Sequence, residues 1–197
     1  MSPPCKVRLT GGFVLLAAWF VLANGWEPLG TVLCAAAVHE LGHWIVLRRL
    51  GAAVTGFCLS ALGAVLETDS SRLSYGGELA AVLAGPAANL LAALALRALD
   101  AGRWPAAMGA NLLLCTFNLL PILPLDGGRA LYLLASWLGG PAAGAEAVRR
   151  LGAVTAAVLA AGLGYVMWRT GGSLWLLPAL FASVYWGALP WFSGTYA

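Results

Sequence analysis

Long apolar stretches fill most of the chain, and charged residues divide them into windows. Six windows come close to the length of about 20 residues that a helix needs to cross a bilayer. They cover residues 9–26, 28–47, 79–96, 105–125, 151–168 and 174–191. This pattern predicts an all-α integral membrane protein with six transmembrane helices.

Two segments depart from the helical pattern. Residues 52–67 are rich in glycine and in β-branched or aromatic residues, which favours a short, partly membrane-dipping β-hairpin on the cytoplasmic side. A simple surface loop is the alternative. Pro121 and Pro124 remove backbone donors, so we expect no continuous helix through residues 118–126. Irregular backbone at membrane depth occurs where it is buried in protein or lines a wet cavity, and this segment therefore predicts an internal cavity.

Composition and charge agree with a membrane protein. The chain has 197 residues, of which 61% are hydrophobic and 10% are charged. Soluble domains carry about 25% charged residues, so an ordinary cytosolic protein is excluded. The formal net charge of +3 is small and scattered, and we expect no nucleic-acid partner.

The basic residues indicate an orientation. A cytoplasmic N-terminus places most of the 11 lysines and arginines on the inside, as the positive-inside rule requires. Lys6 and Arg8 before an apolar run could also begin a cleaved secretory signal, but five further spans favour a retained first helix. We therefore expect a multi-pass protein whose N-terminus is cytoplasmic.

The chain has two histidines, and both lie in the apolar window 28–47, together with Glu40. His39 and His43 are four residues apart, so both imidazoles project from one face of a helix and can hold one zinc ion. Glu40 is turned about 100° away, which suits a general base beside the metal rather than a ligand. The alternative is a catalytically silent polar seam between helices.

A catalytic zinc ion normally has three protein ligands, so a third donor must come from elsewhere in the chain. Of the eight acidic residues, all but Glu40 and Asp126 lie in connections. Asp126 follows the proline-broken segment and precedes two glycines, which leaves it as the candidate third ligand. Its alternative role is the N-cap of a helix over residues 130–138.

Three asparagines also lie inside apolar windows. Asn89 and Asn118 can each hydrogen-bond a substrate backbone or join helices. Asn111 has no motif around it and is interpreted as a contact between helices.

Taken together, His39-Glu40-x-x-His43, Gly85-Pro86-x-x-Asn89 and Asn118-x-x-Pro121-x-x-Pro124-Leu125-Asp126-Gly127-Gly128 resemble the motifs of the site-2 proteases, the zinc intramembrane metalloproteases. The resemblance covers a core of about residues 28–138. It implies that His39, His43 and Asp126 bind one Zn²⁺, that Glu40 is the general base, and that Asn89 and Asn118 help to position the substrate.

The compact form is similar to the bacterial branch that includes the stage IV sporulation protein FB, which processes a membrane-tethered pro-sigma factor. The resemblance implies a transmembrane peptidase domain in a bacterial cytoplasmic membrane. Members of that branch often carry a CBS domain, but here we expect a single domain over residues 1–197 without a CBS or PDZ domain. Its expected partners are the lipid bilayer, a membrane-embedded or membrane-tethered protein substrate, and regulatory membrane proteins.

The predicted activity is hydrolysis of peptide bonds in such substrates near the cytoplasmic face. A helical substrate hides its peptide bonds, so cleavage needs an extended segment, which the strand-like residues 52–67 could hold. The alternative function is a non-catalytic metal-binding membrane protein, either a transporter or a pseudoprotease.

Overall fold

The computed structural model describes residues 6–60, 63–69, 73–100 and 102–169, which divide between two compact units, Met1–Leu119 and Leu120–Ala197. Each unit is described by itself. The predicted window at residues 174–191 lies outside the described residues.

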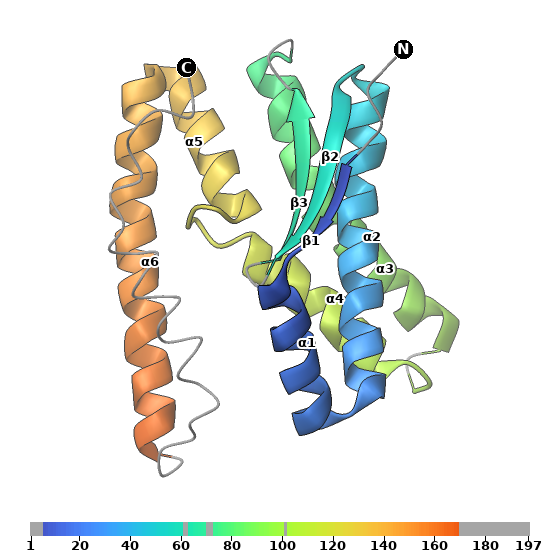
Figure 1. Cartoon of the computed structure of the whole chain (residues 1–197). Helices are drawn as coiled ribbons and strands as arrows, with labels where there is room; N and C mark the ends of the chain where they lie inside the picture. The colour runs from blue at the N-terminus through green and yellow to red at the C-terminus, as the bar shows by residue number, and fades with distance from the viewer. Residues whose placement is uncertain (1–5, 61–62, 70–72, 101, 170–197) are drawn as a thin grey trace. The chain divides into compact units, whose positions relative to one another are not determined.

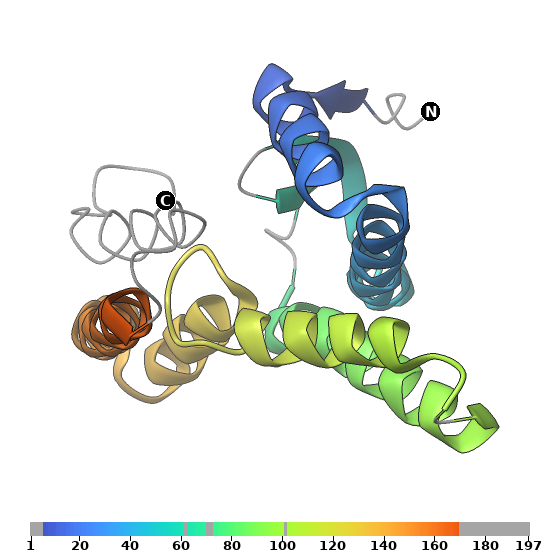
Figure 2. The same cartoon turned by 90° about the horizontal axis from the view of Figure 1, so that it is seen from below.

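The first unit contains four helices and a small sheet (Figure 1). The helices are α1 (Gly11–Asn24), α2 (Trp26–Arg49), α3 (Tyr75–Asp100) and α4 (Pro105–Asn118). Figure 2 shows α3 and α4, in green and yellow-green, running alongside each other, and α2 packs against both. Thr10 caps α1, because its hydroxyl oxygen accepts a hydrogen bond from the backbone N–H of Phe13.

A close approach of two backbones sets the distance between α2 and α3. A Cβ atom added at Gly42 would lie 2.5 Å from the carbonyl oxygen of Ala84 and 2.7 Å from Cβ of Ala88. Only a glycine fits there without displacing α3. The contact holds the segment of α2 that carries His39 and His43 directly against α3.

The sheet combines a hairpin-like pair with a third strand. β2 (Ala53–Ser60) and β3 (Gly63–Asp69) are antiparallel, and they occupy the segment for which the sequence predicts a hairpin. Association of this segment with the membrane stays a prediction. β1 (Lys6–Leu9) pairs with β2 in parallel, with Val7 opposite Phe57.

The third strand corrects the expectation of a helix beginning at residue 9. Leu9 ends β1, and α1 begins only at Gly11 and has 14 residues. The pairing of β1 joins segments fifty residues apart, as Val7 and Phe57 show, which no local pattern can reveal. The all-α prediction is therefore correct for most of the described chain but omits this strand.

In the second unit, the described residues form two helices, α5 (Asp126–Gly139) and α6 (Pro141–Arg169). Gly140, with φ of +84°, makes the turn between them. The two helices approach closely at Gly144, where an added Cβ would lie 2.7 Å from the carbonyl oxygen of Tyr132.

The predicted break at the prolines is confirmed. Helix α4 ends at Asn118, α5 begins at Asp126, and the residues between them are not helical. By contrast, α6 begins ten residues before the predicted window at 151–168. Glu146 forms ion pairs with Arg149 and Arg150 along the helix, so charges that delimited the window belong to the helix.

Three of the described helices, α2, α3 and α6, are long and apolar enough to cross a membrane. Helices α1, α4 and α5 have 14 residues each. The described residues therefore provide three candidate spans of the six that the sequence predicts.

Candidate metal centre

The two histidines of α2 point their outer ring nitrogens at the same place. Nε2 of His39 lies 3.1 Å from Nε2 of His43, and the ring centroids are 4.7 Å apart. His39 is buried, whereas His43 is half-buried. The two Nε2 atoms therefore lie close together on a partly buried face of α2.

The inner nitrogen of His43 is held by the backbone of α3. Nδ1 of His43 lies 2.8 Å from the carbonyl oxygen of Ala81. A carbonyl oxygen can only accept a hydrogen bond, so Nδ1 carries the proton. In the neutral ring Nε2 is then the unprotonated nitrogen.

The inner nitrogen of His39 is held by a side chain of α3. Nδ1 of His39 lies 2.6 Å from Oδ1 of Asn89, whose side chain is completely buried. Nδ2 of Asn89 donates to the carbonyl oxygen of Ala35 at 2.9 Å and to Oδ1 of Asn111 at 2.8 Å. These two acceptors fix the orientation of the Asn89 amide, so Nδ1 of His39 is the donor and its Nε2 is unprotonated in the neutral ring.

Two lone pairs that face each other at 3.1 Å repel, and a bound cation or a shared proton would remove the repulsion. Nitrogens about 2.0–2.1 Å from a tetrahedral zinc ion are about 3.3 Å apart, close to the separation seen here. Zinc-binding histidines also donate their second N–H to a carbonyl or carboxylate. Both histidines therefore fit a zinc ion.

Gly85 of α3 leaves room for the metal. A Cβ atom added there would collide with Nε2 of His43 and lie 2.7 Å from Nε2 of His39. Any other residue would place its side chain where the two nitrogens converge. Gly85 belongs to a motif quoted from the sequence, but its steric role was not predicted.

The predicted general base, Glu40, follows His39 on α2 and is half-buried. Successive residues of a helix are about 100° apart, so its carboxylate leaves the helix beside the histidine face. The catalytic role of Glu40 stays a prediction.

Asp126 belongs to the second unit, where it is the first residue of α5 and is half-buried. The N-cap of α5 is Leu125, so Asp126 does not have the alternative role predicted for it. Its role as the third zinc ligand stays a prediction.

The three asparagines have different surroundings. Asn118, the last residue of α4, is half-buried and donates from Nδ2 to the carbonyl oxygen of Leu114 at 3.0 Å. Asn89 is bonded to a histidine of the candidate centre. Asn111, interpreted from the sequence as a contact between helices, is the next residue in the same hydrogen-bonded chain.

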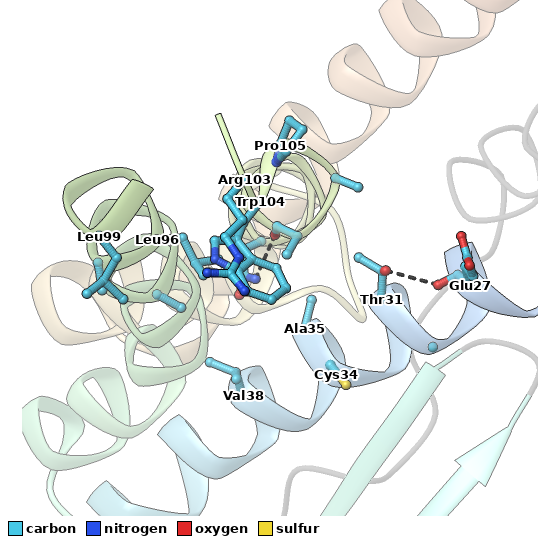
Figure 3. Close-up of a pocket in the computed structure, with 16 residues that line it drawn as sticks. Glu27, Thr31, Cys34, Ala35, Val38, Leu96, Leu99, Arg103, Trp104 and Pro105 are labelled. Atoms are coloured by element: carbon cyan, nitrogen blue, oxygen red, sulfur yellow. Dashed lines mark hydrogen bonds between the residues drawn. The ribbon is translucent and has the colours of Figure 1, made fainter. Parts of the chain in front are cut away.

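A pocket of about 780 Å³ lies between α2, α3 and α4 (Figure 3). Its wall is mainly apolar, and it includes Ala35 and Asn111. Arg103 and Trp104 also line it, and the guanidinium of Arg103 lies 5.3 Å from the ring centre of Trp104. The residues of the proline-broken segment do not line this pocket, so the cavity predicted there stays a prediction.

Several curated proteins are similar in sequence to this chain, although no protein-family model matches it. The proposed zinc metalloprotease Rip3 of Mycobacterium tuberculosis is 33% identical over an alignment of 181 residues, and the match covers 84% of this chain and 45% of Rip3. The stage IV sporulation protein FB of Bacillus subtilis is 29% identical over an alignment of 140 residues, which covers 66% of this chain and 48% of that protein. The chain thus spans less than half the length of these relatives.

A solved structure, the site-2 protease of Methanocaldococcus jannaschii, matches 97% of this chain and 94% of its own chain. The TM-score is 0.66 and the sequence identity is 21%. The chain is related to the site-2 proteases. The predicted resemblance is thereby confirmed, and the likeness to the solved structure shows that the chain has the site-2 protease fold. Together with its apolar helices, this relationship identifies the chain as a membrane protein.

Proposed function

We propose that the protein is an intramembrane zinc metalloprotease. The observation that carries the proposal is the convergence of Nε2 of His39 and Nε2 of His43, whose rings are each oriented by a hydrogen bond at Nδ1. The names of its relatives support the same activity, since Rip3 and two further relatives, from Methanocaldococcus jannaschii and Synechocystis, are named as zinc metalloproteases.

The proposed zinc ligands are His39, His43 and Asp126. Two histidines and a carboxylate form a common ligand set of catalytic zinc, which leaves one position open. Asp126 is included because of the motif around it and because it is not the N-cap of α5. When bound, zinc lowers the pKa of a coordinated water to about 7 and polarises a carbonyl group.

Glu40 performs the proton transfers in this mechanism. Its carboxylate accepts a proton from the attacking water, whose oxygen forms a bond to the carbonyl carbon of the substrate. Glu40 then delivers the proton to the amide nitrogen as the C–N bond breaks. The products are a carboxyl group and an amine.

The proposed substrates are transmembrane or membrane-tethered proteins, cut near the cytoplasmic face. An extended substrate segment can add to a free sheet edge by backbone hydrogen bonds. Within the described part of the chain, β1 and β3 occupy both edges of β2, and no fourth strand pairs with β3. We therefore assign the docking of the substrate to the outer edge of β3.

The topology and biological setting are part of the same proposal. It comprises six spans, a cytoplasmic N-terminus, a catalytic core of about residues 28–138 within one peptidase domain, and a bacterial cytoplasmic membrane. Likeness to the stage IV sporulation protein FB supports processing of a membrane-tethered pro-sigma factor. Regulatory membrane proteins are proposed as further partners.

The decisive experiment compares the zinc content and the cleavage activity of detergent-purified wild type, Glu40→Gln and Asp126→Ala. We expect wild type to bind about one zinc ion and to cleave a tethered test substrate, since a catalytic site holds a single open zinc. Glu40→Gln should keep the metal without cleaving, and Asp126→Ala should lose both. Cleavage by Glu40→Gln would refute the mechanism, and a wild type that binds metal but never cleaves would favour a transporter or pseudoprotease.

A further inference from the structure

A chain of hydrogen bonds connects three helices and ends at the candidate metal centre. It begins at Asn111 on α4, passes through Asn89 on α3 and reaches His39 on α2. The two side-chain links measure 2.8 Å and 2.6 Å. Neither Asn111 nor its connection to the metal centre is explained by the mechanism above.

Backbone carbonyls determine the direction of every link. Nδ2 of Asn111 donates to the carbonyl oxygen of Ala107 at 2.9 Å, which turns Oδ1 of Asn111 toward Asn89. The amide of Asn89 then uses its two N–H groups on Oδ1 of Asn111 and the carbonyl oxygen of Ala35. Because carbonyl oxygens only accept, Oδ1 of Asn89 is left to accept from His39.

Burial makes this orientation hard to change. The exposed fractions are 0% for Asn89 and 5% for both Asn111 and His39. A buried polar group that loses its hydrogen-bond partner costs about 1–3 kcal/mol, so each broken link of this chain would be unfavourable. If the Asn89 amide rotated, its N–H groups would face Nδ1 of His39. That contact favours the other tautomer, in which Nε2 carries the proton and cannot bind a metal.

We propose that Asn111 is a positioning residue for the metal centre, which acts by orienting Asn89 and thereby fixes the metal-binding tautomer of His39. The inference rests on the proposed function, in that the metal is the zinc ion of the protease. In this proposal Asn89 orients His39, rather than positioning the substrate.

The test measures zinc affinity by competition with a chelator, on the purified full chain. Removing a residue that supports a metal ligand typically weakens binding about 10–100-fold. We expect Asn89→Leu to fall in this range and Asn111→Leu to weaken binding about tenfold. Thr116→Val is the matched control, because Thr116 is an exposed residue of the same helix whose hydroxyl bonds only to carbonyls of α4. Its affinity should equal that of wild type.

A double-mutant cycle separates positioning from general stability. If Asn111 acts only through Asn89, adding Asn111→Leu to Asn89→Leu should cause no further loss of affinity. A loss in the double variant equal to the product of the two single losses would overturn the proposal. Asn111→Ser, whose hydroxyl can both accept and donate, should recover part of the affinity and covers the case in which the leucine variant does not fold.

A spectroscopic readout distinguishes this inference from the proposed function. The visible spectrum of the Co²⁺-loaded protein reports the ligand field without any cleavage, and Asn111→Leu should shift it while Thr116→Val does not. Wild type that binds zinc without cleaving would contradict the protease proposal and leave the affinity comparison valid. Equal zinc affinities and equal cobalt spectra for wild type and Asn111→Leu would overturn the inference alone.

Discussion

Nδ1 of His43 and the carbonyl oxygen of Ala81 lie 2.8 Å apart, and this bond joins the histidine face of α2, the proposed metal-binding face, to the backbone of α3. Gly85 lies one turn further along α3, beside the outer nitrogens of both histidines. A single turn of α3 thus orients one ligand and keeps free the space that a metal would occupy.

Replacing Gly85 should therefore remove the metal. In Gly85→Ala the added methyl group would occupy the convergence point of the two Nε2 atoms, and we expect zinc content and cleavage both to fall below one tenth of wild type, the loss seen when a site is disrupted. Elemental analysis of the purified protein measures this. Gly109→Ala on α4 is the control, since an added Cβ at Gly109 meets no atom within 4 Å. Normal zinc content in Gly85→Ala would contradict the position of the site.

The contact at Gly42 predicts opposite effects for two glycines of one helix. Gly42→Ala would drive a methyl group against the carbonyl oxygen of Ala84 and should lower the free energy of unfolding by about 1–3 kcal/mol. Gly30→Ala meets no atom within 4 Å and should raise it by about 0.5–1 kcal/mol, because alanine favours the helix. Denaturant unfolding in detergent measures both. Two changes of the same sign would argue against close packing of α2 on α3.

Removal of the metal should destabilise the folded chain. A ligand that binds only the native state stabilises it by about 4 kcal/mol when its concentration is about 1,000 times its dissociation constant. Dialysis against a chelator should therefore lower the melting temperature of wild type, and Zn²⁺ or Co²⁺ should restore it. The double variant His39→Ala/His43→Ala should melt at one temperature with or without the chelator. If the chelator left the melting temperature of wild type unchanged, this result would count against a resident metal.

The free edge of β3 predicts a difference between two adjacent proline substitutions. Successive N–H groups of a strand face opposite edges, so one of Val65→Pro and Leu66→Pro removes a donor from the outer edge and the other from the ladder with β2. The variant that keeps wild-type thermal stability is the outer-edge variant, because proline is tolerated at edges. That variant should bind zinc normally and cleave a tethered substrate at least tenfold more slowly, as expected if one backbone hydrogen bond of about 1.4 kcal/mol is lost. Wild-type cleavage by it would exclude docking at this edge.

The sequence predicted those parts of the centre that depend on helical spacing alone. His39 and His43 share a face because four residues make about one turn, and the prolines end α4 because they cannot donate to a helix. The role of Asn111 could not be predicted, because its partner Asn89 lies on another helix, 22 residues away in sequence. The hydrogen bond from His43 to the carbonyl oxygen of Ala81 could not be predicted either. Every residue has a backbone carbonyl, so the sequence does not show which one a side chain contacts.

The helix boundaries show the same difference between local and distant information. Cutting the chain at its charges placed the start of the last described span at residue 151, whereas α6 begins at Pro141. The charges of Glu146 and Arg150 satisfy one another within the helix, so they do not end it. Strand β1 was missed because it is four residues long and acquires its regular structure only by pairing with β2.

The glycine contact between α2 and α3 also has a mechanical consequence. Backbone atoms in direct contact leave no flexible side chains between the helices that could absorb a sliding or rocking motion. We therefore expect α2 and α3 to move as one body, and a substrate of the proposed protease to reach the centre without separating them. Cross-links between α2 and α3 should then leave turnover intact.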